Sequence, residues 1–158
     1  MAEQDLAAND PLSEWVTFRL DNEKYGVNVM LVREVLKNTE IAPVPGAPYF
    51  VLGIINLRGN VVTVIDTRTR FSLPQVEPDD ASRIIIIEMD EQVVGMMVDS
   101  VAEVATLRES EIEFAPNVGN DESAKYIQGV SKQDDDLLIL VDLEKLFSLH
   151  EFEQAEAV

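Results

Sequence analysis

The chain holds few side chains that could do covalent or acid–base chemistry. It has no cysteine, and its one histidine, His150, lies in an acidic segment near the C-terminus. A nucleophile needs a base held beside it, and histidine and cysteine most often supply such pairs. The absence of cysteine also excludes thiolate ligands for zinc and a disulfide framework. We therefore expect no catalytic residue, no metal and no cofactor.

The carboxylates are numerous but lack the spacing of a ligand set. Asp79-Asp80 and Asp134-Asp135-Asp136 miss the alternate ligand positions and the closing glutamate of a calcium loop. No glycine-rich phosphate-binding loop follows a strand. Aspartates and glutamates that are distant in sequence could still meet in the fold, as they do in glycosidases. A carboxylate-based β-barrel enzyme or a small-molecule carrier therefore stays open as an alternative.

One basic residue has the type and position of a binding contact. The stretch GIINLRG (53–59) ends an apolar run with Arg58 and Gly59. The planar guanidinium of arginine donates several hydrogen bonds and also stacks on flat surfaces, so it suits recognition beside an apolar patch. Arg58 is either an ordinary turn residue or the contact point for a protein partner.

The elements that would position Arg58 are mainly strands. VTFRL (16–20) alternates apolar with polar residues, the period of a half-buried strand. Around Arg58 we expect a hairpin whose turn contains Gly59 and Asn60, two residues that tolerate positive φ. The predicted hairpins cover 16–29, 53–66 and 83–101, and a fourth strand pair turns at 134–136.

The sequence contains an internal repeat in two blocks. A shift of 69 superimposes V-x-F-x-L-D-x4-G-x5-V-x-E-V (16–35) on I-x-I-x-M-D-x4-G-x5-V-x-E-V (85–104). A shift of 76 superimposes 53–71 on 129–147, with glycine, aspartate and phenylalanine at the same separations. The second copy has no arginine where Arg58 stands, so the scaffold does not require one there, which favours the contact hypothesis. Two blocks in the same order indicate duplication of one small β unit.

A unit of about five short strands exposes its sheet edges unless it curls into a small barrel. We therefore predict an all-β fold of two small five-stranded β-barrels packed side by side, with short helical turns and a C-terminal helix. The domain would span 15–147, with 74–82 as a linker between the two halves.

Four repeated residues have predicted structural roles. Gly26 and Gly95 are expected at backbone bends within strands. Asp66 and Asp142 each follow an apolar strand and precede a helical turn, so both are expected to be N-caps.

The charge of the chain restricts its partners. With 12 basic and 30 acidic residues the formal net charge is −18, so the surface repels phosphate backbones and anionic lipid headgroups. We expect no nucleic-acid binding and no direct membrane insertion. Residues 1–14 and 148–158 hold no lysine or arginine and are expected to be acidic tails. No signal peptide or long apolar run is evident, which predicts a cytoplasmic protein.

Several stretches together resemble the CheW family of bacterial chemotaxis coupling proteins. They are LVREV (31–35), GIINLRGNVVTVIDTR (53–68), VGMMVDSVAEV (94–104), YIQGV (126–130) and LILVDLEKL (138–146). The resemblance runs from about Trp15 to Phe147 in the right order. It implies a non-enzymatic adaptor of two five-stranded barrels that links the cytoplasmic tips of methyl-accepting chemoreceptors to the regulatory domain of the histidine kinase CheA. It also implies recruitment to arrays at the inner membrane and contact with other CheW copies in rings.

The resemblance also assigns residues. Arg58 matches the receptor-facing arginine of the family, and Val32 and Glu34 match positions of partner contact. Val98 and Val101 are expected near a groove between the barrels, where a receptor would bind. Val35 is expected on the kinase side. The rival within the same class is a coupling domain of a non-flagellar chemosensory-like pathway, which the identity of the co-purifying kinase would reveal.

Overall fold

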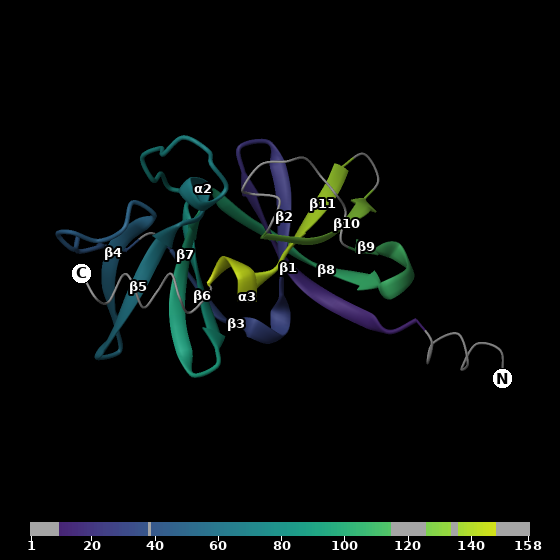
Figure 1. Cartoon of the computed structure of the whole chain (residues 1–158), viewed down its shortest axis with the longest axis horizontal. Coiled ribbons are helices and arrows are strands. Elements are labelled where there is room, and N and C mark those ends of the chain that lie inside the picture. The colour runs from purple at the N-terminus through teal and green to yellow at the C-terminus, as the bar shows by residue number, and fades with distance from the viewer. Residues whose placement is uncertain (1–9, 38, 115–125, 134–135, 148–158) are drawn as a thin grey trace.

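The computed structural model of the chain describes residues 10–37, 39–114, 126–133 and 136–147. In Figure 1 these residues form two β-sheets that lie side by side, with two short helices between them. Of the predicted tails, residues 1–9 and 148–158 lie outside the described residues. The predicted boundary of the disordered N-terminal tail at residue 14 is wrong, since β1 already begins at Leu12. The mainly β fold with two packed sheets is confirmed, whereas closure of each sheet into a barrel stays a prediction.

One sheet has six strands and the other has five. The six-stranded sheet has the order β8-β1-β2-β11-β10-β9, and the five-stranded sheet has the order β3-β6-β7-β5-β4. The strands of the six-stranded sheet are β1 (Leu12–Leu20), β2 (Glu23–Asn28), β8 (Ser100–Arg108), β9 (Glu113–Phe114), β10 (Ile127–Gln133) and β11 (Asp136–Val141). Those of the five-stranded sheet are β3 (Val32–Lys37), β4 (Val51–Leu57), β5 (Asn60–Asp66), β6 (Arg83–Met89) and β7 (Gln92–Val98).

Four short helices complete the described chain. Two are 3₁₀ turns, η1 (Val29–Leu31) and η2 (Glu109–Glu111), and two are α-helical, α2 (Thr67–Arg70) and α3 (Leu143–Leu146). The predicted C-terminal helix is thus a single turn. Asp66 caps α2, since its side chain accepts a hydrogen bond from the Arg68 N–H, and Asp142 caps α3 through the Lys145 N–H. Both predicted N-caps are confirmed.

The four predicted strand pairs are present. β1 pairs with β2, β4 with β5, β6 with β7 and β10 with β11, all antiparallel. The two shifts found in the sequence also relate these elements. The shift of 76 carries β4 onto β10 and α2 onto α3, residue for residue. The duplication is therefore visible in the elements themselves.

The assignment of one barrel to each half of the chain is wrong, because from its third strand onward each repeat lies in the sheet that holds the first two strands of the other repeat. β3 pairs with β6 of the second copy, and β8 pairs with β1 of the first copy. The predicted linker 74–82 joins α2 to β6 within one sheet, so it does not separate the sheets. The chain passes between sheets at η1 and at Asp99 instead.

Buried side chains form three clusters. One cluster comes from the five-stranded sheet alone and comprises Ile55, Val62, Val64, Ile84, Ile86 and Met97. A second, from the six-stranded sheet side, comprises Trp15, Leu107, Ile112, Leu138 and Leu140. The largest draws on both sheets and includes Phe18, Ile85, Ile87 and Val98. Because the isoleucines of RIIIIEM alternate between two clusters, each is buried, contributing roughly 2–3 kcal/mol of transfer free energy apiece.

The repeated glycines allow close approach. A Cβ on Gly53 would collide with the backbone of Ala42, and one on Gly129 would lie 2.7 Å from the Glu113 carbonyl oxygen. Both follow a shift of register within their hairpins. Gly26 and Gly95 lie in regular strand pairs, so the bend predicted for them is replaced by close packing. A Cβ on Gly95 would lie 2.9 Å from Ile84 Cγ2.

Candidate functional site: a protein-binding face around Arg58

Arg58 lies at the tip of the β4–β5 hairpin. Its φ is 52° and that of Gly59 is 87°, so both central turn residues adopt the left-handed conformation. Asn60 does not use its tolerance of positive φ, since it is the first residue of β5. The Asn56 side chain accepts a hydrogen bond of 2.9 Å from the Gly59 N–H and holds the turn. A positive φ is uncommon for a residue other than glycine, so the conformation of Arg58 is an unusual feature of this turn.

Arg58 is held by Glu34 of β3. Arg58 Nη1 donates to Glu34 Oε2 at 2.7 Å, and Arg58 Nη2 donates to Glu34 Oε1 at 2.8 Å. The Arg58 side chain is 69% exposed and that of Glu34 is 22% exposed. This two-bonded geometry fixes the plane of the guanidinium while leaving its remaining face in solvent. The sequence assigned both residues to the same surface, and the structure brings them together.

The ion pair joins opposite edges of the five-stranded sheet. β3 and β4 are the first and last strands of its order, and Arg58 directly follows β4. Ala42, which lies between β3 and β4 in the chain, also bridges to Ile54 of β4, with hydrogen bonds of 2.9 and 2.8 Å. The sheet must curl for these contacts to form. Arg58 is thereby fixed to two strands at once.

The two charges perturb each other in the expected directions. The hydrogen bonds from Arg58 lower the pKa of the Glu34 carboxyl group below its ordinary value. Glu34 in turn raises the pKa of the Arg58 guanidinium. Each group is therefore held in its charged form at neutral pH. The surface therefore carries a permanent cation, and its counter-charge on Glu34 is mostly covered.

Apolar surface flanks the arginine. Val61 of β5 is 69% exposed, which is unusual for a valine in a strand. A hollow of about 320 Å³ beside Arg58 is lined by Arg33, Val61 and Glu91 among others. A second hollow of about 320 Å³ shares Val61 and continues along Ile54 and Ala42. The Arg58 guanidinium thus lies beside one exposed valine and between polar and apolar hollows, a mixed surface of the kind found at protein interfaces.

The other predicted contact residues lie at different depths. Val32 and Val101 are partly buried and pack against the largest core cluster. The shift of 69 relates these two valines to each other. Val32 is the first residue of β3 and Val101 is the second residue of β8, and at these two strands the chain enters the other sheet. Val35 is 40% exposed. Because the register shifts between Val32 and Glu34, Val35 lies on the face opposite Glu34 and on the same side of β3 as Val32.

Val98 requires a correction. Its side chain is 1% exposed and belongs to the core between the sheets, so it cannot offer a contact to a partner. β7 lies inside the five-stranded sheet with β6 and β5 on its two sides, and the residues from Val94 to Val98 are all buried. The run VVGMMV was the available signal, because near-continuous apolar runs mark strands buried on both faces.

Neither the exposure of Val61 nor the contact between Glu34 and Arg58 was predicted from the sequence. The two paired residues are 24 positions apart, and no local pattern joins them. Val61 has a sequence signal, since its equivalent in the second copy is Leu137, which is 40% exposed. Both copies therefore place an apolar residue at the same exposed position.

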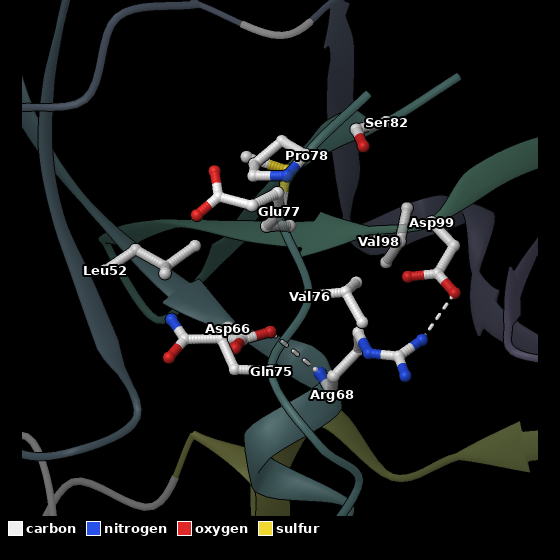
Figure 2. Close-up of a pocket in the computed structure, with 11 residues that line it drawn as sticks. Leu52, Asp66, Arg68, Gln75, Val76, Glu77, Pro78, Ser82, Val98 and Asp99 are labelled. Carbon is white, nitrogen blue, oxygen red and sulfur yellow. Dashed lines mark hydrogen bonds and ion pairs between the residues drawn. The ribbon is translucent and has the colours of Figure 1, made fainter. Parts of the chain in front are cut away.

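The enzyme or carrier alternative finds little support among the described residues. The interiors of both sheets are filled mainly with aliphatic side chains. One cavity of about 290 Å³, shown in Figure 2, is lined by charged groups that include Asp66, Arg68 and Asp99. These groups already bind one another or the backbone, as described below for Arg68.

The described part of the chain contains no helix with the length and hydropathy of a membrane span.

Two packed sheets with apolar interiors carry an exposed arginine that Glu34 orients. The CheW-like domain family matches residues 14–151. The chain is 34% identical over 142 residues to a chemotaxis protein CheW from Rhizobium meliloti, covering 90% of this chain and 92% of that protein. It is 38% identical over 127 residues to a chemotaxis protein CheW from Bacillus subtilis, covering 80% and 81%.

A solved structure agrees with these relatives. The crystal structure of the scaffolding protein TtCheW from Thermoanaerobacter tengcongensis matches with a TM-score of 0.81 and 38% identity, over 89% of this chain and 96% of that chain. The chain belongs to the CheW-like domain family. The expected resemblance is confirmed, and with it the expectation of a scaffold rather than an enzyme, since the matched relatives are chemotaxis and scaffolding proteins.

Proposed function

We propose that this protein is a chemotaxis adaptor that couples chemoreceptors to the histidine kinase CheA. The observation that carries the proposal is Arg58, exposed at a hairpin tip and oriented by Glu34 at 2.7 and 2.8 Å. An orientation fixed before binding lowers the entropy cost of association. We take the identity of the partners from membership of the CheW-like domain family. The second copy of the repeat has no arginine at the position of Arg58, so the fold does not need one there, which supports a role of Arg58 in recognition.

The receptor partner is the helical hairpin at the cytoplasmic tip of a methyl-accepting chemoreceptor. Its apolar stripe would lie near Val32 and Val101, with Arg58 and Glu34 fixing its register through hydrogen bonds. Partial exposure of both valines beside the core between the sheets supports this placement. Helices that dock in grooves use apolar anchors with a few polar contacts, which is the composition found here.

The kinase partner is the regulatory domain of CheA, on the side of Val35. Val35 is exposed on β3, and alternation places it on the face opposite Glu34, so one strand could serve both partners. Further copies of the chain would complete rings within arrays at the inner membrane, in the cytoplasm. The chain makes no covalent step and transmits state through differential contacts.

The direct test is retention of separate fragments on the immobilised full chain. A receptor-tip fragment and a CheA regulatory-domain fragment are each applied alone, with a fragment-free resin as control. We expect both fragments to be retained. Retention of neither fragment would overturn the proposal, and retention of a different histidine kinase in their place would assign the chain to another pathway.

A further inference from the structure

A charged network connects the two sheets at one of their two junctions. Arg68 of α2 has a side chain that is 7% exposed, yet it pairs with two carboxylates. Arg68 Nη2 lies 2.7 Å from Asp21 Oδ1, and Arg68 Nη1 lies 2.6 Å from Asp99 Oδ2. Its Nε donates to the Pro74 carbonyl oxygen at 2.7 Å. Figure 2 shows the Arg68 side chain extended toward Asp99 along one side of the cavity.

The three charged residues come from different parts of the fold. Asp21 lies in the β1–β2 turn of the six-stranded sheet, and Arg68 follows β5 of the five-stranded sheet. Asp99 is the single residue between β7 and β8, where the chain passes from one sheet to the other. Asp99 Oδ2 also accepts a hydrogen bond of 2.8 Å from the Asp21 N–H, and the Asp99 N–H donates to the Arg19 carbonyl at 3.1 Å.

The duplication supplies an internal comparison. The positions equivalent to Arg68, Asp99 and Asp21 in the other copy are Glu144, Met30 and Asp90. Glu144 and Asp90 are exposed and Met30 is 84% exposed, and within the described part of the chain none of the three forms an ion pair. Since β2 still passes to β3 there, the fold forms a junction without such a network.

We propose that Arg68 is a positioning residue that fixes the angle between the two sheets, and thereby the receptor-binding face that spans them. Only the arginine of this network is buried, since the Asp21 and Asp99 side chains are 49% and 29% exposed. An ion pair of a buried charge adds little net stability but can specify one arrangement among several. The link from the angle to receptor binding rests on the proposed function. In that function the receptor contacts both Val32 and Val101, and these residues lie on strands of different sheets. A kinase fragment bound near Val35 touches the five-stranded sheet alone.

The test of the angle uses spin-label distances in the full chain. The absence of native cysteine allows Lys37→Cys and Lys132→Cys, which place one exposed label on a strand of each sheet. We expect one narrow distance distribution in the otherwise unchanged chain. Arg68→Met should broaden or shift it, and Asp21→Asn should do so more weakly. Asparagine tolerates the φ of 55° at position 21, so this second variant keeps the turn.

A matched control is Arg19→Met, which removes an ion pair between Arg19 and Asp136 within the six-stranded sheet. This variant should leave the distances unchanged. The unlabelled Arg68→Met and Asp21→Asn variants should bind a receptor-tip fragment between about twofold and thirtyfold more weakly. Their affinity for a CheA regulatory-domain fragment should match that of the unaltered chain.

Three outcomes decide the proposal. Unchanged distance distributions in both variants would show that the network does not set the angle. Equal loss of both affinities, together with a lower melting temperature, would show a general stabilising role and would also overturn it. If the unaltered chain binds neither fragment, the proposed function fails, while the distance measurement still decides whether Arg68 orients the sheets.

Discussion

Arg58 at the tip of the β4–β5 hairpin and Glu34 on β3 form a two-bonded ion pair of 2.7 and 2.8 Å across opposite edges of one sheet. The arginine is mostly exposed and the glutamate is mostly covered. Glu34 therefore acts on a partner chiefly through Arg58. This relationship predicts that the two residues behave as one unit in binding.

The first prediction is non-additivity of Glu34 and Arg58. Glu34→Gln should weaken receptor-tip binding by a smaller factor than Arg58→Ala, because the amide still accepts a hydrogen bond but lacks charge. In the Arg58→Ala background the same change should have almost no further effect. Calorimetric titration of the four proteins measures this coupling. Independent, additive losses would show that Glu34 contacts the partner by itself.

The second prediction concerns pH. Arg58 lowers the folded-state pKa of Glu34, so the ion pair is complete above the ordinary carboxyl pKa and is lost as pH falls through the lowered value. Receptor binding should therefore show no step from this pair between neutral pH and the ordinary carboxyl range. In Arg58→Ala the Glu34 titration midpoint, followed by carboxyl-carbon NMR, should rise toward its ordinary value. An unchanged midpoint would contradict the pairing.

The third prediction separates two glycines of the same hairpin. Gly53→Ala should destabilise the fold by roughly 2–4 kcal/mol, because its Cβ would meet the Ala42 backbone where φ is +153°. Gly59→Ala should cost only about 1 kcal/mol, since φ is +87° but nothing lies within 4 Å of the new atom. Chemical unfolding measures both. If the two variants lost equal free energy of unfolding, the close approach of Gly53 to the Ala42 backbone would not be important for stability.

The fourth prediction uses the duplication as its control. Val35→Asn should weaken binding of the CheA regulatory fragment by about fivefold to tenfold and leave receptor-tip binding unchanged. Val104→Asn alters the equivalent valine of the second copy, which is 48% exposed against 40% for Val35. The control should bind both fragments normally. If both variants lose kinase binding alike, Val35 has no special place in that interface.

Local elements followed from the sequence, whereas the partners of strands did not. Strand alternation predicted the hairpins, and glycine and aspartate spacing predicted the equivalence of β4 to β10 and the two N-caps. A repeat shows that two segments share a structure but not which strand pairs with which. The crossing of β3 and β8 between sheets therefore had no sequence signal.

The candidate site followed from the sequence in part. Arg58 was identifiable because the second copy lacks it, and its exposure agrees with a contact role. Its pairing with Glu34 depends on curling of the sheet, which brings β3 to the β4–β5 turn. Val98 was misplaced because its position was taken from the family resemblance, whereas the apolar run VVGMMV is typical of a strand buried on both faces.

The central claim is that Arg58 recognises the receptor and is not needed for the fold. Calorimetric titration of a receptor-tip fragment into the unaltered chain, Arg58→Ala and the exposed control Arg19→Ala tests it most directly, with the melting temperature of each protein measured in parallel. We predict that Arg58→Ala binds at least about tenfold more weakly at an almost unchanged melting temperature, whereas Arg19→Ala binds normally. Normal binding by Arg58→Ala, or a loss explained by a lower melting temperature, would contradict it.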